Sequence, residues 1–293
     1  MDLRLTAQRR GRLSGFLTGE LRMSTSLVNK LKWGEALRVN GQVRRTDFPV
    51  EIGDEITVCL DEPAPEYPPE PGELVILYED GWLLAVDKPA GMLIHPSRCR
   101  NTGTLANRVA GYYQSTHQKS AFHPLTRLDR DTFGVVLLAK SAYVHTLLQA
   151  CPVEKTYEAL TFGGPAEEAG TIDLPIARRP LPSLLRYVDP SGKPARTEFR
   201  VLERRGPVCR LSLKPVTGRT HQLRVHCAHQ GYPILGDPQY GTEASQAYAQ
   251  TLALPHQMLQ AKSLTLPHPI TGEMLEIPSE MRMGAWGVES RGL

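Results

Sequence analysis

Two arginines and two aspartates crowd into five positions immediately before a run of apolar residues. The segment FHPLTRLDRDTFGVVLLAK, residues 122–140, carries Arg127, Asp129, Arg130 and Asp131 at the start of what is predicted to be a buried strand. A solvated turn would account for these charges. Carboxylates beside guanidinium groups at the mouth of a strand can also hold an ionised nucleophile ready for reaction. The spacing alone does not choose between the two carboxylates.

Two later segments add groups that could take part in chemistry. Tyr157 lies in EKTYEAL, residues 154–160, which is predicted to be a strand, although a strand tyrosine is usually a packing residue. In LKPVTGRTHQLRVHCAHQGYPILGDPQYG, residues 213–241, Gly218 allows a strand to turn sharply into a helix. Arg219 would then stand at the mouth of that helix.

Three histidines in the same helical segment suggest a metal site at first sight. They are His221, His226 and His229. On a helix, residues 226 and 229 share a face, whereas 221 and 226 lie about 140° apart. No carboxylate at ligand spacing accompanies them in the helix, so we predict no metal site. Interior helix contacts and hydrogen bonds to phosphate are the better explanation of these histidines.

Strand patterns dominate the chain after residue 73, and helices are fewer. LVILYED and WLLAVDKP are joined at Asp80-Gly81 and predict a β-hairpin. Further strands are predicted in VVLLAK, TYEALTF, ARTEFRVLE and VCRLSLKPV, and helices around residues 104–114, from Ser141 and from Thr220. This order predicts an α+β domain built on a largely antiparallel mixed sheet with flanking helices. There is no glycine-rich phosphate loop and no dinucleotide fingerprint, so no nucleotide cofactor is expected.

A proline-rich, acidic spacer divides the chain. Residues 61–73, DEPAPEYPPEPGE, contain five prolines and five acidic residues but no Lys or Arg. Prolines at this density favour an extended, semi-rigid segment and do not fit a helix or a central strand. We therefore predict an N-terminal domain over residues 1–60, a linker over 61–73 and a larger domain over 74–293.

The N-terminal domain is predicted to be a small α+β module. Ser24 or Ser26 could cap a short helix, and LRVNGQV predicts a hairpin that turns at Asn40-Gly41. Four cations of the module are candidate contacts for RNA phosphates, although such charges are usually just solvated. They are Lys30, Lys32, Arg44 and Arg45.

The bulk composition narrows the class of protein. Hydrophobic residues make up 41% and charged residues 22% of the 293 residues, as in ordinary soluble proteins. The net charge of +3 by itself does not indicate a nucleic-acid-binding protein. The five cysteines are scattered without a C-x-x-C pair, and no apolar run exceeds five residues. These features predict a soluble, cytoplasmic protein without a membrane partner, which we expect to be a monomer.

Four segments taken together resemble the RluA family of pseudouridine synthases. KPAGMLIHP, RLDRDTFG, KTYEAL and GRTHQLRVH…GYPILGDPQYG follow in that family's order and approximate spacing, over residues 74–293. The front of the chain resembles the S-four-type RNA-binding domain through the order S-x-x-x-V-x-K-L, V-N-G-x-V and G-D-x-I. Such a module is a common companion of the catalytic domain in this family.

The resemblance implies a role for each matching residue. The aspartate of the R-L-D segment is the family's catalytic nucleophile, which falls on Asp129 and leaves Asp131 as a structural carboxylate. Tyr157 would stack on the uracil and is the candidate general base. Arg219 would pair with the nucleophile and stabilise its charged form when a bound base excludes water. Arg127 matches the arginine that helps to fill the space left by the extruded nucleotide.

The implied reaction converts a uridine in RNA to its C-glycoside isomer, with no redox change and no group transfer. No cofactor or metal is expected, and the implied partner is RNA, with ribosomal RNA ahead of transfer RNA. The alternative is an RNA-binding protein or ribosome assembly factor whose synthase domain is catalytically impaired. An aspartate-nucleophile hydrolase ranks last, because the sequence offers neither an acid partner at fixed spacing nor a metal site.

Three positions depart from the family pattern. Thr126 and Phe133 replace a histidine and a serine around the nucleophile, and Gln260 replaces the histidine of a Leu-His-Ala segment near the C-terminus. We expect both missing histidines to belong to one supporting network that was lost as a unit. Thr126 and Gln260 can still form hydrogen bonds, but neither titrates near neutral pH. Because the nucleophile, the tyrosine and the arginine are retained, activity is expected.

Overall fold

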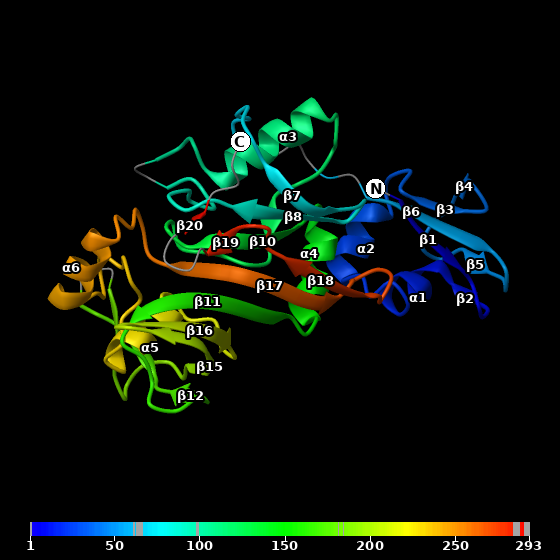
Figure 1. Ribbon diagram of the computed structural model, residues 1–293. Helices are drawn as coiled ribbons and strands as arrows, with labels where there is room; N and C mark the ends of the chain where they lie inside the picture. Colours follow the sequence, from blue (N-terminus) through cyan, green and yellow to red (C-terminus); the bar gives the residue numbers. More distant parts are fainter. Residues whose placement is uncertain are drawn as a thin grey trace.

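The computed structural model of the chain describes residues 2–60, 62, 67–97, 100–180, 182–183, 185–283 and 288–289. A large mixed sheet curves through the molecule, with helices beside it and a smaller N-terminal lobe at one side (Figure 1). The α+β class predicted from the strand pattern is confirmed. Residues 61 and 63–66 of the predicted linker, and Cys99, lie outside the described residues.

The large sheet has the strand order β12-β15-β16-β11-β17-β10-β8-β7, with β18 paired to β17 and β9 to β10. Among its described pairs, only β10 and β17 run parallel. Its strands are β7 (Val75–Glu79), β8 (Leu83–Lys88), β9 (His123–Pro124), β10 (Phe133–Ala139), β11 (Glu154–Phe162), β12 (Ala169–Asp173), β15 (Arg196–Arg205), β16 (Val208–Pro215), β17 (Leu259–Pro267) and β18 (Met274–Pro278). Two short ribbons lie apart from it, β13 (Ile176–Arg178) with β14 (Arg186–Val188), and β19 (Arg282–Met283) with β20 (Val288–Glu289).

Four helices accompany this sheet: α3 (Leu105–Ser115), α4 (Ala142–Ala150), α5 (Gln222–His229) and α6 (Glu243–Thr251). The side chains of Thr104 and Ser141 accept N–H groups of the first turns of α3 and α4, and both helices begin within one residue of the predicted positions. The helix predicted from Thr220 begins at Gln222, because His221 has a left-handed backbone with φ 57°. Over the described part of the chain, no helix combines the length and apolar character needed to cross a membrane.

The N-terminal lobe contains a four-stranded sheet and two short helices. The sheet has the order β1-β6-β3-β4, formed by β1 (Asp2–Thr6), β6 (Glu55–Cys59), β3 (Leu37–Val39) and β4 (Gln42–Val43), while β2 (Gly11–Arg12) pairs with β5 (Pro49–Val50). The helices are α1 (Leu13–Thr18) and α2 (Thr25–Leu31), and Ser24 caps α2. Asn40 and Gly41 have φ angles of 50° and 77°, as a two-residue hairpin turn requires. The predicted helix and hairpin are confirmed.

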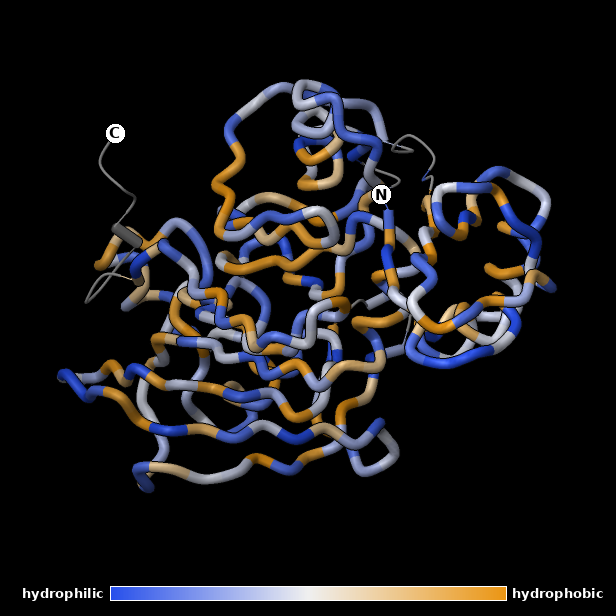
Figure 2. Tube along the Cα trace, turned by 90° about the vertical axis from the view of Figure 1, so that its right-hand side faces the viewer, coloured by the Kyte–Doolittle hydropathy of each residue, from blue (hydrophilic) through white to orange (hydrophobic). Residues whose placement is uncertain are grey.

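The lobe shares a hydrophobic core with one side of the large sheet. Leu17 and Val28 of the lobe belong to the same buried cluster as Leu137 of β10 and Tyr143 of α4. The Tyr143 hydroxyl donates to the carbonyl of Leu21, which ties α4 directly to the lobe. Figure 2 shows the lobe beside the larger body, with apolar segments on the strands that line its interior. The two parts therefore pack as one body.

The end of the predicted linker lies against α3. The N–H of Glu70 donates to the carbonyl of Asn107 at 3.0 Å, and the Asn107 amide donates to the carbonyl of Pro68 at 3.0 Å. The Glu70 carboxylate accepts from the N–H of Gly103 at 2.8 Å. Residues 67–72 are thus fixed along a helix of the larger body.

Candidate functional site

A cavity of about 500 Å³ opens where the loop before β10 faces β11 and the start of α5. Its walls include residues 125–129, Thr132, part of β11 and residues 215–224. Four residues singled out from the sequence line it: Arg127, Asp129, Tyr157 and Arg219. The fold therefore brings three distant segments of the chain to one cavity.

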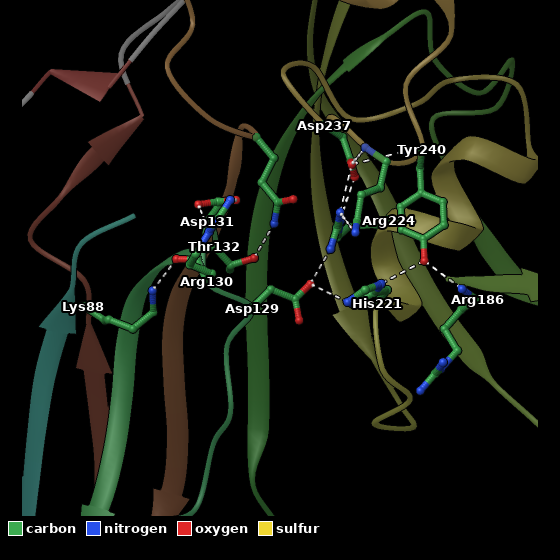
Figure 3. A network of polar contacts seen from close by, with 12 residues as sticks. Lys88, Asp129, Arg130, Asp131, Thr132, Arg186, His221, Arg224, Asp237 and Tyr240 are labelled. Carbon is green, nitrogen blue, oxygen red and sulfur yellow. Dashed lines mark hydrogen bonds and ion pairs between the residues drawn. The ribbon is translucent and has the colours of Figure 1, made fainter. Parts of the chain in front are cut away.

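Asp129 stands at the start of a turn that two buried side chains hold in place (Figure 3). The N–H of Thr132 donates to the carbonyl of Asp129 at 3.2 Å, and the Thr132 hydroxyl accepts from the amide of Gln257 at 2.7 Å. Lys88 is fully buried, and its ammonium donates to the carbonyl of Arg130 at 3.0 Å and to two carbonyls of the loop after β8. The backbone from Asp129 to Thr132 is thus anchored to its surroundings.

The carboxylate of Asp129 is paired with Arg224, a buried residue of α5. Arg224 Nη1 donates to Asp129 Oδ2 at 2.8 Å. Arg224 Nε and Nη2 donate to the two oxygens of Asp237 at 2.7 and 2.9 Å (Figure 3). Burial acts to lower the pKa of Arg224, but Asp237 and Asp129 outweigh it and raise that pKa. The fork of the guanidinium thereby fixes one oxygen of Asp129, and Oδ1 accepts no hydrogen bond from the described residues.

The pairing with Asp129 that the resemblance assigned to Arg219 is wrong. Arg219 precedes α5, its side chain is exposed, and its Nε donates to the carbonyl of Pro194 at 2.9 Å. The helix begins only at Gln222, so Arg224 is the arginine on the helix itself, where its side chain reaches Asp129. A signal was present in the sequence, because an arginine inside a predicted buried helix requires a carboxylate partner.

His221 is a second neighbour of Asp129. Its Nε2 lies 3.8 Å from Asp129 Oδ2, and its Nδ1 is 2.8 Å from the hydroxyl of Tyr240. That hydroxyl accepts the backbone N–H of Arg186, so it is free to donate to Nδ1 and leaves the proton of the neutral ring on Nε2. Burial lowers the pKa of His221, although the charge of Asp129 opposes this effect. A neutral imidazole thus points its N–H toward the carboxylate.

Tyr157 lies on β11, partly buried in the cavity wall. Burial, and in second place the charge of Asp129, raises the pKa of its phenol to about 12. The phenol therefore keeps its proton at neutral pH. Arg127 lines the same cavity with an exposed side chain, whereas Asp131 forms an ion pair with Arg130 at 2.9 Å outside the cavity wall.

The positions that depart from the family pattern take part in separate hydrogen bonds. Thr126 is buried and accepts from the N–H of Leu137 at 3.2 Å. The amide of Gln260, buried on β17, donates to Ser279 at 3.0 Å and to the carbonyl of Met281 at 2.7 Å. Within the described residues no hydrogen bond joins Thr126 to Gln260, so the expectation of one shared network is not supported.

Of the two histidines after His221, His226 has structural partners. His226 is buried, its Nε2 donates to the carbonyl of Leu174 at 3.0 Å, and its Nδ1 lies 2.9 Å from the hydroxyl of Thr197. His229 is exposed at the end of α5. The described residues contain no cluster of three histidine, cysteine or acidic side chains that could hold a metal ion.

The four cations predicted to contact RNA lie at the surface of the N-terminal lobe. Lys30 and Arg45 are exposed, and Lys32 and Arg44 are half-buried. Sequence reasoning missed Trp33, whose side chain is 76% exposed and whose ring centre lies 4.7 Å from the Lys32 ammonium. An exposed indole beside cations is a suitable platform for a nucleic-acid base.

Comparison with known proteins identifies the family. Residues 82–229 match the family described as RNA pseudouridylate synthase. Ribosomal large subunit pseudouridine synthase D of Pseudomonas aeruginosa is 38% identical over 84% of this chain and 80% of its own length. An uncharacterized RNA pseudouridine synthase of Bacillus subtilis, YjbO, is 34% identical over 90% of this chain and 94% of its own.

A solved structure supports the same assignment. Human RNA Pseudouridylate Synthase Domain Containing 1 aligns with a TM-score of 0.59 and 29% identity. The alignment covers 72% of this chain and 85% of the human chain. With the catalytic segments converging on one cavity and relatives matching most of its length, the chain belongs to the RluA family of RNA pseudouridine synthases and is an isomerase.

Proposed function

We propose that this enzyme isomerises specific uridines of ribosomal RNA, with Asp129 as the nucleophile. The observation that carries the proposal is the Asp129 carboxylate in the cavity wall, with Oδ2 held by Arg224 and Oδ1 unengaged by the described residues. Relatives from Pseudomonas aeruginosa and Pasteurella multocida carry the name ribosomal large subunit pseudouridine synthase D, which supports ribosomal RNA as the substrate.

The cavity is large enough for a nucleotide turned out of its helix. In the reaction the bond between N1 of uracil and C1′ of ribose breaks, and the base rotates within the cavity. Carbon 5 then bonds to C1′, carbon 5 loses a proton and N1 gains one. Atoms and electrons balance without an oxidant, a reductant or a group donor, so the work of the protein is to extrude, hold and turn the base.

The side chains around Asp129 divide this work. Arg224 takes the role first assigned to Arg219, because it orients the nucleophile and stabilises its charge while the base excludes water. Tyr157 stacks against the uracil, since a phenol with a pKa of about 12 is better suited to packing than to proton removal near pH 7. Arg127, exposed at the cavity, contacts the strand from which the nucleotide is extruded.

The N-terminal lobe, residues 1–60, acts in this proposal as an S-four-type RNA-binding domain. Its support is the S-four-like order of motifs in the sequence together with a surface that carries Lys30, Arg45 and the exposed Trp33. Residues 61–73 join it to the catalytic domain, residues 74–293. We place the protein in the cytoplasm, where the scattered cysteines would stay reduced.

A map of pseudouridines in ribosomal and transfer RNA tests the substrate. Chemical labelling with reverse-transcription stops would compare a strain lacking this protein with the same strain complemented by wild type or by Asp129→Ala. The proposal predicts that at least one stop in ribosomal RNA vanishes on deletion and returns only with wild type. Stops that change only in transfer RNA would contradict the substrate, and stops restored by Asp129→Ala would contradict the nucleophile.

A further inference from the structure

A second cavity of about 490 Å³ adjoins the catalytic one. Gly218, Arg219 and Thr220 line both cavities and form the wall that they share. The rest of the second cavity is lined by β13, by Arg186 of β14 and by residues 191–193. The two cavities are therefore direct neighbours on either side of this segment.

The charged side chains of the second cavity are all cationic. They are Arg178, Arg186, Lys193 and Arg219. Arg178, Lys193 and Arg219 form no ion pair with any carboxylate that the structure describes. Among the described residues of its wall there is no aromatic side chain on which a base could stack. Its chemistry thus suits phosphate groups rather than bases.

Two of the cations come from adjacent positions of neighbouring strands. Arg178 and Arg186 are direct partners across the β13–β14 pair, so their side chains start close together at this wall of the cavity. In Figure 3 the guanidinium of Arg186 extends away from the Asp129–Arg224 pair, so it is not part of the nucleophile's own network.

The backbone holds the other two cations firmly. Lys193 exchanges both backbone hydrogen bonds with Ile176, at 2.9 and 3.0 Å. Gly192 lies so close to β13 that a Cβ there would be 2.4 Å from the carbonyl carbon of Ile176, so this turn requires glycine. Arg219 is fixed by its bond to the carbonyl of Pro194, next to Lys193. The backbone of Lys193 and the guanidinium of Arg219 are therefore held at the wall of the cavity.

We propose that the second cavity binds backbone phosphates of the nucleotides adjacent to the target uridine. This inference rests on the proposed function, because it concerns the RNA strand that would deliver a uridine to Asp129 and run on across the wall shared by the two cavities. It assigns Arg219 to the RNA backbone, in place of the pairing with the nucleophile. Because contacts to phosphates do not read bases, the cavity would contribute affinity and register but no sequence preference.

The test measures RNA binding by an Arg178→Gln/Lys193→Gln double variant. The probe is a fluorescein-labelled oligouridylate of about nine nucleotides, since any of its residues can occupy the uridine site. A matched control, Lys119→Gln/Arg200→Gln, removes the same charge from exposed positions outside both cavities. Fluorescence anisotropy would give Kd between about 50 and 200 mM salt, the range in which phosphate contacts dominate its change.

We expect the salt dependence of Kd to decrease in the cavity variant and to stay unchanged in the control variant. Two lost phosphate contacts on a single strand reduce the slope of log Kd against log salt by about 1.4, and binding weakens roughly tenfold at low salt. The control variant should match wild type. Equal slopes in the cavity and control variants, or wild-type binding without salt dependence, would overturn the inference.

Failure of this inference can be told from failure of the proposed function. Release of tritium from ribosomal RNA labelled at carbon 5 of uracil reports the isomerisation and needs no assumption about the second cavity. Suppose that tritium release requires Asp129, but the double substitution leaves the slope of log Kd against log salt unchanged. That result would contradict only the phosphate site. Tritium release that persists in Asp129→Asn would instead contradict the assignment of Asp129 as the nucleophile.

Discussion

At the residue scale, Asp129 owes its placement to a chain of three charges. Asp237 is buried and fixes two nitrogens of Arg224, and the remaining Nη1 then points at Asp129. Because a guanidinium held at both ends cannot rotate, the carboxylate of Asp129 has one defined orientation. The arrangement places the guanidinium of Arg224 directly against the Asp129 carboxylate in the cavity wall.

These contacts predict that substitutions of Arg224 and Arg219 have different effects on kcat. Arg224→Lys keeps the charge but cannot bond Asp129 and Asp237 through one planar fork, so kcat should fall by roughly a hundredfold. Arg219→Lys, which is the matched control, should leave kcat within about twofold of wild type, because Arg219 has no contact with Asp129. Initial rates of tritium release at saturating RNA measure both. A larger loss of kcat in the Arg219 variant would contradict this assignment.

The raised pKa of Tyr157 gives a stability prediction with a defined sign. An unfolded tyrosine ionises near pH 10, whereas Tyr157 in the folded protein has a pKa of about 12. Between these values the folded state binds more protons than the unfolded state, so stability must fall as pH rises through this range. Tyr157→Phe removes that part of the loss.

Urea midpoints of wild type and Tyr157→Phe across about pH 8 to 11 measure this effect. Their difference should stay constant up to about pH 10 and then move in favour of the phenylalanine variant. Two curves that remain parallel up to the highest pH would show that Tyr157 ionises as an ordinary tyrosine.

At the element scale, the parallel pairing of β10 with β17 joins the two antiparallel parts of the large sheet beside the site. Gly134 of β10 has φ 110° and faces Ala261 of β17, where an added Cβ would lie 2.2 Å from the carbonyl oxygen. Only glycine permits this approach. Asp129 lies on the turn that leads into β10, so its position depends on the same contact.

Gly134→Ala should therefore lower the free energy of unfolding by about 2 kcal/mol or more, through a positive φ and a clash with backbone. Gly81→Ala is the control, since nothing lies within 4 Å of a Cβ there and its φ is not positive. Urea unfolding compares the two. Similar midpoints for both variants would mean that β17 moves away from β10 without cost.

Much of this element structure could be predicted from the sequence. Hairpin turns at Asp80-Gly81 and Asn40-Gly41, and the caps at Thr104 and Ser141, carry local signals that the structure follows. The central strand β17 was missed, because LQAKSLTLP mixes polar and apolar residues and its burial comes from neighbours on both sides. The start of α5 was missed by two residues, because a left-handed His221 leaves no mark on composition.

At the scale of the whole molecule, the cavity depends on contacts between residues that are far apart in the sequence, and these contacts cannot be predicted from the order of the elements. Asp129, Tyr157 and the segment around residue 219 could be grouped from the family resemblance alone. Which arginine reaches Asp129 is decided by where α5 begins and by the partner at Asp237. The shared core between lobe and sheet likewise follows from tertiary packing, because the acidic spacer suggested only two parts joined by a linker.

That shared core predicts that the catalytic part alone is destabilised. A chain of residues 74–293 would expose the side of α4 on which Tyr143 and Val144 pack, and would lose the bond to Leu21. Its melting temperature should lie several degrees, roughly 5 °C or more, below that of the full chain. Calorimetry of both chains tests this, and equal melting temperatures would show that the lobe only rests on the sheet.

The most direct measurement of the central claim compares Asp129→Asn with Asp131→Asn. The two carboxylates lie two residues apart, but only Asp129 lines the cavity and contacts Arg224, whereas Asp131 pairs with Arg130. Tritium release from uracil carbon 5 of ribosomal RNA, under single-turnover conditions, should be undetectable for Asp129→Asn and within about tenfold of wild type for Asp131→Asn. Full activity of Asp129→Asn, or loss only in Asp131→Asn, would contradict Asp129 as the nucleophile.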